Sequence, residues 1–456
     1  MKMVSRNPYT GQILREFDTL EFSDSLPSVQ ESRRFFPEWR EAPVQQRGEY
    51  LRAIAGRLRA QQRAFAEAIT LEMGKPIAQS LAEIEKCAWL LDYFADSSAS
   101  FLQEERVETG ALRSYIRFEP LGIILGIMPW NFPFWQVFRF AVPALMAGNV
   151  GLLKHASNVP STALAIEKLF RDSGVPGPVF QTLLLDPRGA GQLIERELVD
   201  GVSLTGSVEA GAQIASLAGR HIRKVVLELG GSDPFLVLED ADIPKAARMA
   251  LQARMINSGQ SCIAAKRLIV TAPVAAPFLE ALEQELQGVR IGDPLDPSTT
   301  IGPLAKQGFV EVLSGQMEDA RRKGARVILG PPPPPGPGFF FRPALVTRVR
   351  KDMRILSEEV FGPILPVQVA RDEGELVEMA NDTPYGLGAS LWTRDLPRGE
   401  RIARKLEAGF VAVNDMVKSD PRLPFGGIKK SGFGRELSEY GLKEFVNIKS
   451  VVVHGA

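Results

Sequence analysis

The run LGIILGI, residues 121–127, begins the pattern that decides the fold of this chain. Its length and apolar character are those of a buried β-strand. A helical period follows at about residues 134–146, then a second strand-like run, NVGLLK at 149–154, and a second helical run, STALAIEKLFRDSG at 161–174. Strands that alternate with helices of this length predict βαβ units and a parallel sheet. Such an α/β fold binds nucleotides at the carboxyl ends of its strands.

The alternation extends through most of the chain. Residues 28–105 have the three-to-four-residue apolar period of helices, and further helices are predicted at about 243–258 and 276–288. Further strand-like runs are PVFQTLLL (178–185), GVSLTG (201–206), KVVLEL (224–229), PFLVLED (234–240) and AKRLIVTA (265–272). The run PPPPPGPG at 331–338 is predicted to be a surface loop, because proline cannot continue a helix or a central strand. A chain of 456 residues is too long for one ordinary core and predicts two large domains with a smaller third element.

Composition and charge narrow the possible partners. The chain is 45% hydrophobic and 24% charged, and its 54 Lys plus Arg residues balance its 54 Asp plus Glu residues. A net charge of zero argues against nucleic acid or an anionic membrane as the main partner. The N-terminus has no apolar core typical of a signal peptide. The most apolar stretch, 121–135, is interrupted by Pro129 and Pro133 well short of the roughly 20 residues of a membrane span. We therefore expect a cytoplasmic protein.

Cysteine and histidine are scarce. The two cysteines, Cys87 and Cys262, are far apart and predict no disulfide framework, which suits a reducing compartment. His155, His221 and His454 have no metal-ligand spacing with one another or with a cysteine. We therefore expect no metal site, and a carboxylate rather than a histidine as any general base.

Three local patterns carry candidate chemistry, and each also has a structural interpretation. Cys262 lies in NSGQSCIAAKR (257–267), either as a nucleophile or as a small core side chain like Cys87, which is predicted to pack inside a helix. Glu228 ends the strand in KVVLELGGSD, either as a general base or as a solvated strand end. Asn131 in GIMPWNFPFW either donates to an oxyanion or fixes a proline-rich turn. In LTGSVEAG (204–211), Gly206 precedes a helix whose first N–H groups could approach a pyrophosphate.

Together these motifs resemble the aldehyde dehydrogenase superfamily, from about Asn7 to the C-terminus. Four more motifs match in the family's order: LLKHASNVPS (152–161), LTGSVEAG (204–211), EEVFGPILPV (358–367) and PFGGIKKSGFGRE (424–436). The resemblance implies a Rossmann-like cofactor domain (1–108 and 128–228), an α/β catalytic domain (229–420) and a small β oligomerisation element (109–127 and 421–456). Because the tail FVNIKSVVVHG and the segment GALRSYIRFEP (110–120) resemble oligomerisation strands, a homodimer or homotetramer is expected.

The resemblance also implies a mechanism. Cys262 attacks an aldehyde, and the Asn131 amide and the Cys262 backbone N–H hold the oxyanion. Glu228 activates the water that hydrolyses the resulting thioester. Relatives that transfer the acyl group to coenzyme A typically lack this glutamate, so a free carboxylic acid is the expected product. A catalytically silent member is the non-enzyme alternative.

The cofactor is expected to be NADP, with NAD used more weakly. Lys154 resembles the family lysine at the adenosine ribose, and Ser157 stands where relatives that prefer NAD usually have a glutamate that repels a 2′-phosphate. The remaining cofactor contacts implied by the family motifs are Trp130, Gly206, Ser207, Leu229, Glu359 and Phe361.

The expected substrate is a short ω-oxo acid, succinate semialdehyde first and glutarate semialdehyde next. Arg139, eight residues after Asn131, matches the arginine that binds the substrate carboxylate in succinate-semialdehyde dehydrogenases, although it could instead cover apolar surface. Ser419 matches a second carboxylate contact, and Trp135 and Phe425 are expected to wall the methylene chain. A broader aliphatic or amino-aldehyde dehydrogenase is the alternative.

Overall fold

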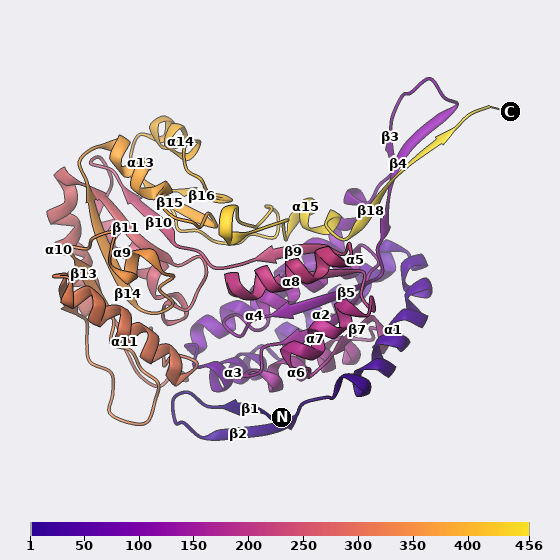
Figure 1. Ribbon diagram of the computed structural model, residues 1–456, viewed down its shortest axis with the longest axis horizontal. Helices are drawn as coiled ribbons and strands as arrows, with labels where there is room; N and C mark the ends of the chain where they lie inside the picture. The colour runs from indigo at the N-terminus through magenta and orange to yellow at the C-terminus, as the bar shows by residue number, and fades with distance from the viewer. Residues whose placement is uncertain (1, 456) are drawn as a thin grey trace.

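The computed structural model describes residues 2–455. Figure 1 shows two α/β bodies side by side, one built mainly from the first half of the chain and the other from the second, with a β-ribbon extending away from them. The chain opens with a hairpin of β1 (Lys2–Arg6) and β2 (Ile13–Asp18). The α/β class predicted from the sequence is confirmed.

The first body begins with the helices predicted for residues 28–105. They are α1 (Phe22–Glu41), α2 (Val44–Ala60), α3 (Gln62–Met73) and α4 (Ile77–Phe101). Helix α4 buries a stripe that includes Ile84, Cys87, Leu91 and Phe94, with the spacing of one helix face. Cys87 is fully buried in this stripe, so its predicted packing role is confirmed.

A six-stranded sheet forms the centre of the first body. Its order is β17-β9-β8-β5-β6-β7, and all neighbours are parallel except β17, which is antiparallel to β9. The strands are β5 (Ile123–Met128), β6 (Val150–His155), β7 (Phe180–Thr182), β8 (Gly201–Thr205), β9 (Lys224–Glu228) and β17 (Gly432–Phe433). The helices between them are α5 (Trp135–Met146), α6 (Pro160–Asp172), α7 (Pro187–Glu195) and α8 (Val208–Arg220).

The strand order places the candidate residues at one edge of this sheet. The chain passes from β5 outward to β6 and β7 and then returns to β8 on the other side of β5. This reversal opens a crevice at the carboxyl ends of the strands, where ligands bind in such sheets. Asn131 follows β5, Gly206 follows β8 and Glu228 ends β9, so all three candidates meet at that edge.

The second body contains a seven-stranded sheet with the order β12-β13-β14-β11-β10-β15-β16, in which only β12 and β13 are antiparallel. Its strands are β10 (Asp233–Val237), β11 (Ala265–Thr271), β12 (Arg326–Leu329), β13 (Ala344–Thr347), β14 (Ile364–Ala370), β15 (Gly388–Trp392) and β16 (Phe410–Val413). Its helices are α9 (Ile243–Met255), α10 (Ala275–Gln287), α11 (Gln307–Arg322), α12 (Arg354–Ser357), α13 (Glu373–Asn381) and α14 (Leu396–Ala403). The proline-rich run 331–338 lies outside every helix and strand, as predicted.

The ribbon is a three-stranded antiparallel sheet of β3 (Glu105–Arg106), β4 (Arg113–Pro120) and β18 (Val446–Val453), preceded by α15 (Ser438–Lys443). The late strand therefore pairs with β4, as the tail and the segment 110–120 suggested. The predicted limit of the oligomerisation element at residue 127 is wrong, because β5 already belongs to the six-stranded sheet. Single 3₁₀ turns occur at Gly177–Val179, Ala272–Val274 and Lys429–Ser431. Across residues 2–455, every helix is too short or too polar to cross a bilayer.

Candidate active site

The turn before Cys262 has an unusual backbone. Helix α9 was predicted to run to about Ser258, but it ends at Met255. Asn257 (φ 52°), Ser258 (φ 56°) and Gly259 (φ 80°) are then left-handed in succession. A non-glycine residue in this region costs about 1–2 kcal/mol, least for asparagine. The helical period could not reveal this turn, because apolar spacing does not report a change of backbone handedness.

Contacts on both sides hold the turn in place. Asn257 Nδ2 donates to the carbonyl oxygens of Asn131 (2.7 Å) and Gln260 (3.2 Å). Gly259 lies against the backbone of Gly362, with which any Cβ would collide. Residues 257–260 (NSGQ) thus form a buried, left-handed turn, and this turn connects Cys262 to two neighbouring loops.

Gly362 belongs to the EEVFGP loop, which a buried arginine fixes. Arg254, on α9, donates to the carbonyl oxygens of Ile364 (2.6 Å) and Val360 (2.9 Å), and also to that of Gly362. One guanidinium therefore ties three carbonyls of the loop to the helix that leads into the Cys262 turn.

Cys262 is partly buried on the wall between two cavities, and it lines both. Burial raises the pKa of its thiol to about 11, while the nearby cations Arg139 and Lys266 act in the opposite direction. Lys266 Nζ donates to the Cys262 carbonyl oxygen (2.6 Å) and to Glu359 Oε1 (2.7 Å). Sequence reasoning missed Lys266, although it lies inside the NSGQSCIAAKR motif.

Asn131 lies on the same cavity wall as Cys262. Its Nδ2 donates to the Gln260 carbonyl oxygen at 3.2 Å, and its buried Oδ1 has no partner within the described part of the chain. Because an amide nitrogen carries two N–H groups, one donor remains available toward the cavity. Glu83 of α4 accepts from the backbone N–H groups of Phe134 (2.9 Å) and Trp135 (3.0 Å), which fixes the segment after Asn131.

Glu228 is buried behind the cavities rather than on their walls. It lies beside Arg139, with 3.7 Å between Nη2 and Oε2, and both side chains are 2% exposed. Its Oε1 has no hydrogen-bond partner among residues 2–455. Burial raises the pKa of Glu228 well above its ordinary value, and the Arg139 charge only partly opposes this. The alternative of a solvated strand end is therefore wrong.

Arg139 was expected to bind a substrate carboxylate, and the structure shows that its charge already has a partner within the protein. Its guanidinium is ion-paired with buried Glu436 and lies 4.6 Å from the centroid of the Phe425 ring. Glu436 is held in place by a two-residue antiparallel bridge to Phe425, with both N···O distances 2.7 Å. The partner was missed because no local spacing connects Arg139 with a residue near the C-terminus.

The cofactor-side cavity, of about 230 Å³, brings together most of the predicted cofactor residues. Those on its wall are Trp130, Gly206, Ser207, Leu229, Glu359 and Phe361. The Trp130 ring packs edge-on against Phe361, with centroids 5.9 Å apart. Ser207 begins α8 as its N-cap and accepts from Ala210 N–H at 3.2 Å, so the first N–H groups of a 13-residue helix point toward this edge.

Lys154 and Ser157 lie outside this cavity; Lys154 is near the end of β6, and Ser157 is exposed two residues beyond that strand. Burial lowers the pKa of Lys154, and the nearby positive charge of Lys306 lowers it further while Asp186 opposes both. Neither lysine forms an ion pair with any described residue. Two lysines without an ion pair, Lys154 of β6 and Lys306 at the start of α11, therefore lie near each other.

The substrate-side cavity, of about 190 Å³, contains all four predicted substrate residues on its wall. They are Trp135, Arg139, Ser419 and Phe425. Lys86 of α4 also lines it and was not singled out in the sequence. In the sequence this helix was considered only for the packing of Cys87, so the neighbouring Lys86 was missed.

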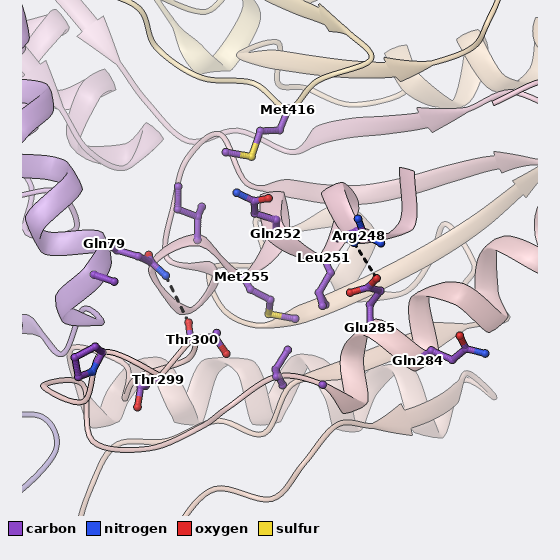
Figure 2. Close-up of a pocket in the computed structure, with 15 residues that line it drawn as sticks. Gln79, Arg248, Leu251, Gln252, Met255, Gln284, Glu285, Thr299, Thr300 and Met416 are labelled. Atoms are coloured by element: carbon purple, nitrogen blue, oxygen red, sulfur yellow. Dashed lines mark hydrogen bonds and ion pairs between the residues drawn. The ribbon is translucent and has the colours of Figure 1, made fainter. Parts of the chain in front are cut away.

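A larger cavity of about 690 Å³ adjoins the substrate-side cavity, since Gln79, Ile256 and Met416 line both. Figure 2 shows it between the turn carrying Thr299 and Thr300 and the helices that carry the ion pair of Arg248 with Glu285. Its wall has no cysteine or histidine. The nucleophile candidate Cys262 therefore lines the two smaller cavities and not this one.

A sequence model of the aldehyde dehydrogenase family matches residues 1–451. The chain belongs to the aldehyde dehydrogenase family. A relative from Synechocystis, named "Probable succinate-semialdehyde dehydrogenase [NADP(+)]", is 47% identical over 454 residues, 99% of both chains. A second relative, named "Succinate-semialdehyde dehydrogenase [NADP(+)] 1", from Mycobacterium ulcerans, is 42% identical and covers 99% of this chain and 100% of its own.

Solved structures agree with this aldehyde dehydrogenase fold. The crystal structure of succinic semialdehyde dehydrogenase from Streptococcus pyogenes, in complex with NADP+ as the cofactor, matches with a TM-score of 0.97. It is 34% identical and covers 99% of this aldehyde dehydrogenase and 100% of its own chain. Within residues 2–455, no group of three or more His, Cys, Asp or Glu side chains is arranged to hold a metal ion.

Proposed function

We propose that this aldehyde dehydrogenase oxidises succinate semialdehyde to succinate with NADP+. The observation that carries the proposal is the position of Cys262 on the wall shared by the cofactor-side and substrate-side cavities. A nucleophile at this position can bond to the carbonyl carbon of an aldehyde in the substrate-side cavity, while the hydride leaves toward the cofactor-side cavity. The names of the Synechocystis and Mycobacterium relatives, 47% and 42% identical over nearly the whole chain, support the same substrate and cofactor.

The chain's own residues account for the acyl chemistry. The Cys262 thiolate adds to the carbonyl carbon, and the free amide N–H of Asn131 with the Cys262 backbone N–H stabilises the resulting oxyanion. When bound, NADP+ supplies the acceptor for the hydride whose departure leaves a thioester on Cys262. Glu228 then takes a proton from water, which attacks the thioester, releases succinate and restores the thiol. In this conformer Glu228 faces Arg139, so it must turn toward the cavity for that step.

The residues present fit NADP+. The N-terminus of α8, with Gly206 and Ser207, would hold the pyrophosphate, and Trp130, Leu229, Glu359 and Phe361 would surround the nicotinamide end. Lys154, with the positive charge of Lys306 near it and the exposed Ser157 three residues further along the chain, suits an additional phosphate on the adenosine ribose.

The variant Ser157→Glu is expected to reverse the cofactor preference. A carboxylate beside Lys154 would neutralise its charge and repel a 2′-phosphate, so the ratio of kcat/KM with NADP+ to kcat/KM with NAD+ should fall by about 10-fold to 100-fold. Steady-state kinetics with saturating aldehyde measure the ratio. Ser157→Gln, similar in size but uncharged, is the control and should change the ratio less; an unchanged ratio in Ser157→Glu would contradict the assignment.

The substrate proposal is tested by steady-state kinetics with succinate semialdehyde, glutarate semialdehyde, butanal and 4-aminobutanal, each with NADP+ and NAD+. We expect kcat/KM to be highest for succinate semialdehyde with NADP+, at least about tenfold above butanal, since a charged hydrogen bond is worth that much. Equal values for butanal would favour a broad aliphatic dehydrogenase, and no NADPH formation with any aldehyde would favour a silent family member.

The arrangement of the chain in an assembly is part of the same proposal. We propose a cofactor domain, a catalytic domain (229–420) and an oligomerisation ribbon of β3, β4 and β18, with β5 assigned to the cofactor domain. The ribbon exposes Ile448 (60%) and Val452 (53%), apolar residues that a second copy would cover in a homodimer or homotetramer. A cytoplasmic location stays a prediction from the sequence.

A further inference from the structure

We propose that Lys86 binds the carboxylate of the substrate, with Ser419 as the second donor. The inference rests on the proposed function, because it assigns the anionic end of the substrate to one part of the substrate-side cavity. It transfers to Lys86 the role that the family resemblance implied for Arg139.

Three cationic side chains line this cavity, and two of them already have a counter-ion. Arg139 is ion-paired with Glu436, and Lys418 Nζ lies 2.7 Å from Asp415 Oδ2. Lys86 forms no ion pair with any residue that the structure describes. Because a partly buried cation is unfavourable without a counter-ion, Lys86 is the cation on this wall that a bound anion would stabilise most.

The acidic residues nearest to Lys86 are engaged with other cations. Glu83, on the same helix, is ion-paired with buried Lys75. Asp420 Oδ2 lies 2.7 Å from Arg422 Nη2. Both carboxylates act on Lys86 only through space. The positive charge of Lys86 is therefore open toward the cavity.

The hydrogen bonds around Lys86 leave the right number of donors for a carboxylate. Its Nζ donates to Ser419 Oγ at 2.8 Å and lies 4.3 Å from the centroid of the Trp135 ring. One of the three ammonium N–H groups is used, so two remain. Ser419 accepts from Lys86, which leaves its own O–H free to donate. The pair thus offers three donors to the two oxygens of a carboxylate, the charge-assisted geometry in which such bonds are strongest.

A purely structural interpretation also exists, in which Lys86 only ties α4 to the loop that carries Ser419. The two interpretations differ in what the charge does. A structural tie affects every aldehyde alike, whereas a carboxylate site affects only substrates that carry one.

The deciding variants are Lys86→Met, which keeps the length of the side chain but removes its charge, and Lys86→Arg, which keeps a charge. With Lys86→Met, the KM for succinate semialdehyde is expected to rise by about 10-fold to 100-fold, while kcat/KM for butanal changes less than about threefold. Lys86→Arg should retain most of the preference for the charged aldehyde. Lys418→Met is the matched control, because that lysine lines the same cavity but is paired with Asp415; its substrate preference should stay at the wild-type value.

A binding measurement separates recognition from turnover. 4-Hydroxybutyrate carries the same carboxylate without the aldehyde, so it should compete with succinate semialdehyde in the wild-type enzyme. Its inhibition constant should rise in Lys86→Met by the same factor as the KM, and stay unchanged in Lys418→Met.

The pH dependence provides a readout that a structural role would not produce. Burial, and then the charge of Arg139, lowers the pKa of Lys86 to about 8, with Cys87, Asp420 and Glu83 acting in the opposite direction. Lys86 is thus charged below pH 8 and loses its charge above it. The ratio of kcat/KM for succinate semialdehyde to that for butanal should therefore fall above about pH 8 in the wild type and be flat in Lys86→Met. Taking the ratio cancels the titration of Cys262, which both aldehydes share.

Each result supports or overturns a defined statement. If the wild type prefers succinate semialdehyde and Lys86→Met keeps that preference, or loses activity equally toward butanal, the role of Lys86 is wrong while the proposed function stands. If the wild type shows no preference for succinate semialdehyde over butanal, the proposed substrate is wrong, and the carboxylate site is wrong with it.

Discussion

The variant Cys262→Ser is expected to lower kcat for succinate semialdehyde by at least about 10³-fold. A serine hydroxyl is hardly ionised at neutral pH, and neither cavity that Cys262 lines has a histidine on its wall to pair with it as a base. The NADPH absorbance measures the loss. Binding of NADP+ to the variant should be retained, because the turn before residue 262 is fixed by Asn257 and Gln260 and not by the thiol.

The raised pKa of Cys262 sets the direction of the pH dependence. With a thiol pKa of about 11, the thiolate fraction grows about tenfold for each pH unit through the neutral range. The rate of the first turnover with butanal, which has no carboxylate, should therefore increase from pH 7 to pH 9. If Cys262→Ser kept more than about a tenth of the wild-type rate, the assignment of the nucleophile would be wrong.

The variant Glu228→Gln is expected to form the thioester and then stop. Its kcat should fall by about 10²-fold to 10⁴-fold, the usual effect of losing a general base. The first turnover should still produce one NADPH for each active site, since Cys262 and Asn131 are unchanged. Rapid mixing would show this burst, and mass spectrometry of the quenched enzyme would show the acyl group on Cys262.

Several observations would distinguish this outcome from simple damage to the fold. Burial raises the pKa of Glu228, so a neutral side chain is already close to what the folded protein favours there, and urea unfolding should change little. In the wild type, the rate of thioester hydrolysis should increase with pH as Glu228 ionises. Loss of the NADPH burst together with the steady-state rate would contradict a role confined to hydrolysis.

The sequence predicted the parts of the protein that are encoded locally. The alternation of strands and helices predicted the α/β fold, and the short motifs around Glu228 and Asn131 predicted residues that the topology of the six-stranded sheet places at one edge. Cys262 instead precedes β11 of the second sheet and lies on the same cavity wall as Asn131. The fold class is confirmed. The positions of Asn131 and Glu228 could be predicted because the carboxyl ends of neighbouring parallel strands meet, so a motif directly after a strand has a known location.

The incorrect or missing predictions concern contacts between residues far apart in the chain. The pairing of Arg139 with Glu436 and the hydrogen bond of Lys86 to Ser419 depend on how the C-terminal segment packs across the first body. No periodicity reports such a contact. Arg139 was therefore assigned a partner outside the protein, when its partner was a buried glutamate of the same chain.

The close contact of Gly259 with Gly362 joins two segments of the site into one structural unit. The turn that presents the nucleophile and the loop that carries Glu359 and Phe361 touch backbone to backbone, and Arg254 fastens the loop to the helix leading into the turn. A substitution in either piece must therefore disturb the other. Ser157, which we propose to lie near the 2′-phosphate, is exposed and outside the cofactor-side cavity. A substitution at Ser157 is therefore expected to change the cofactor preference during evolution without altering the packed turn and loop around Cys262.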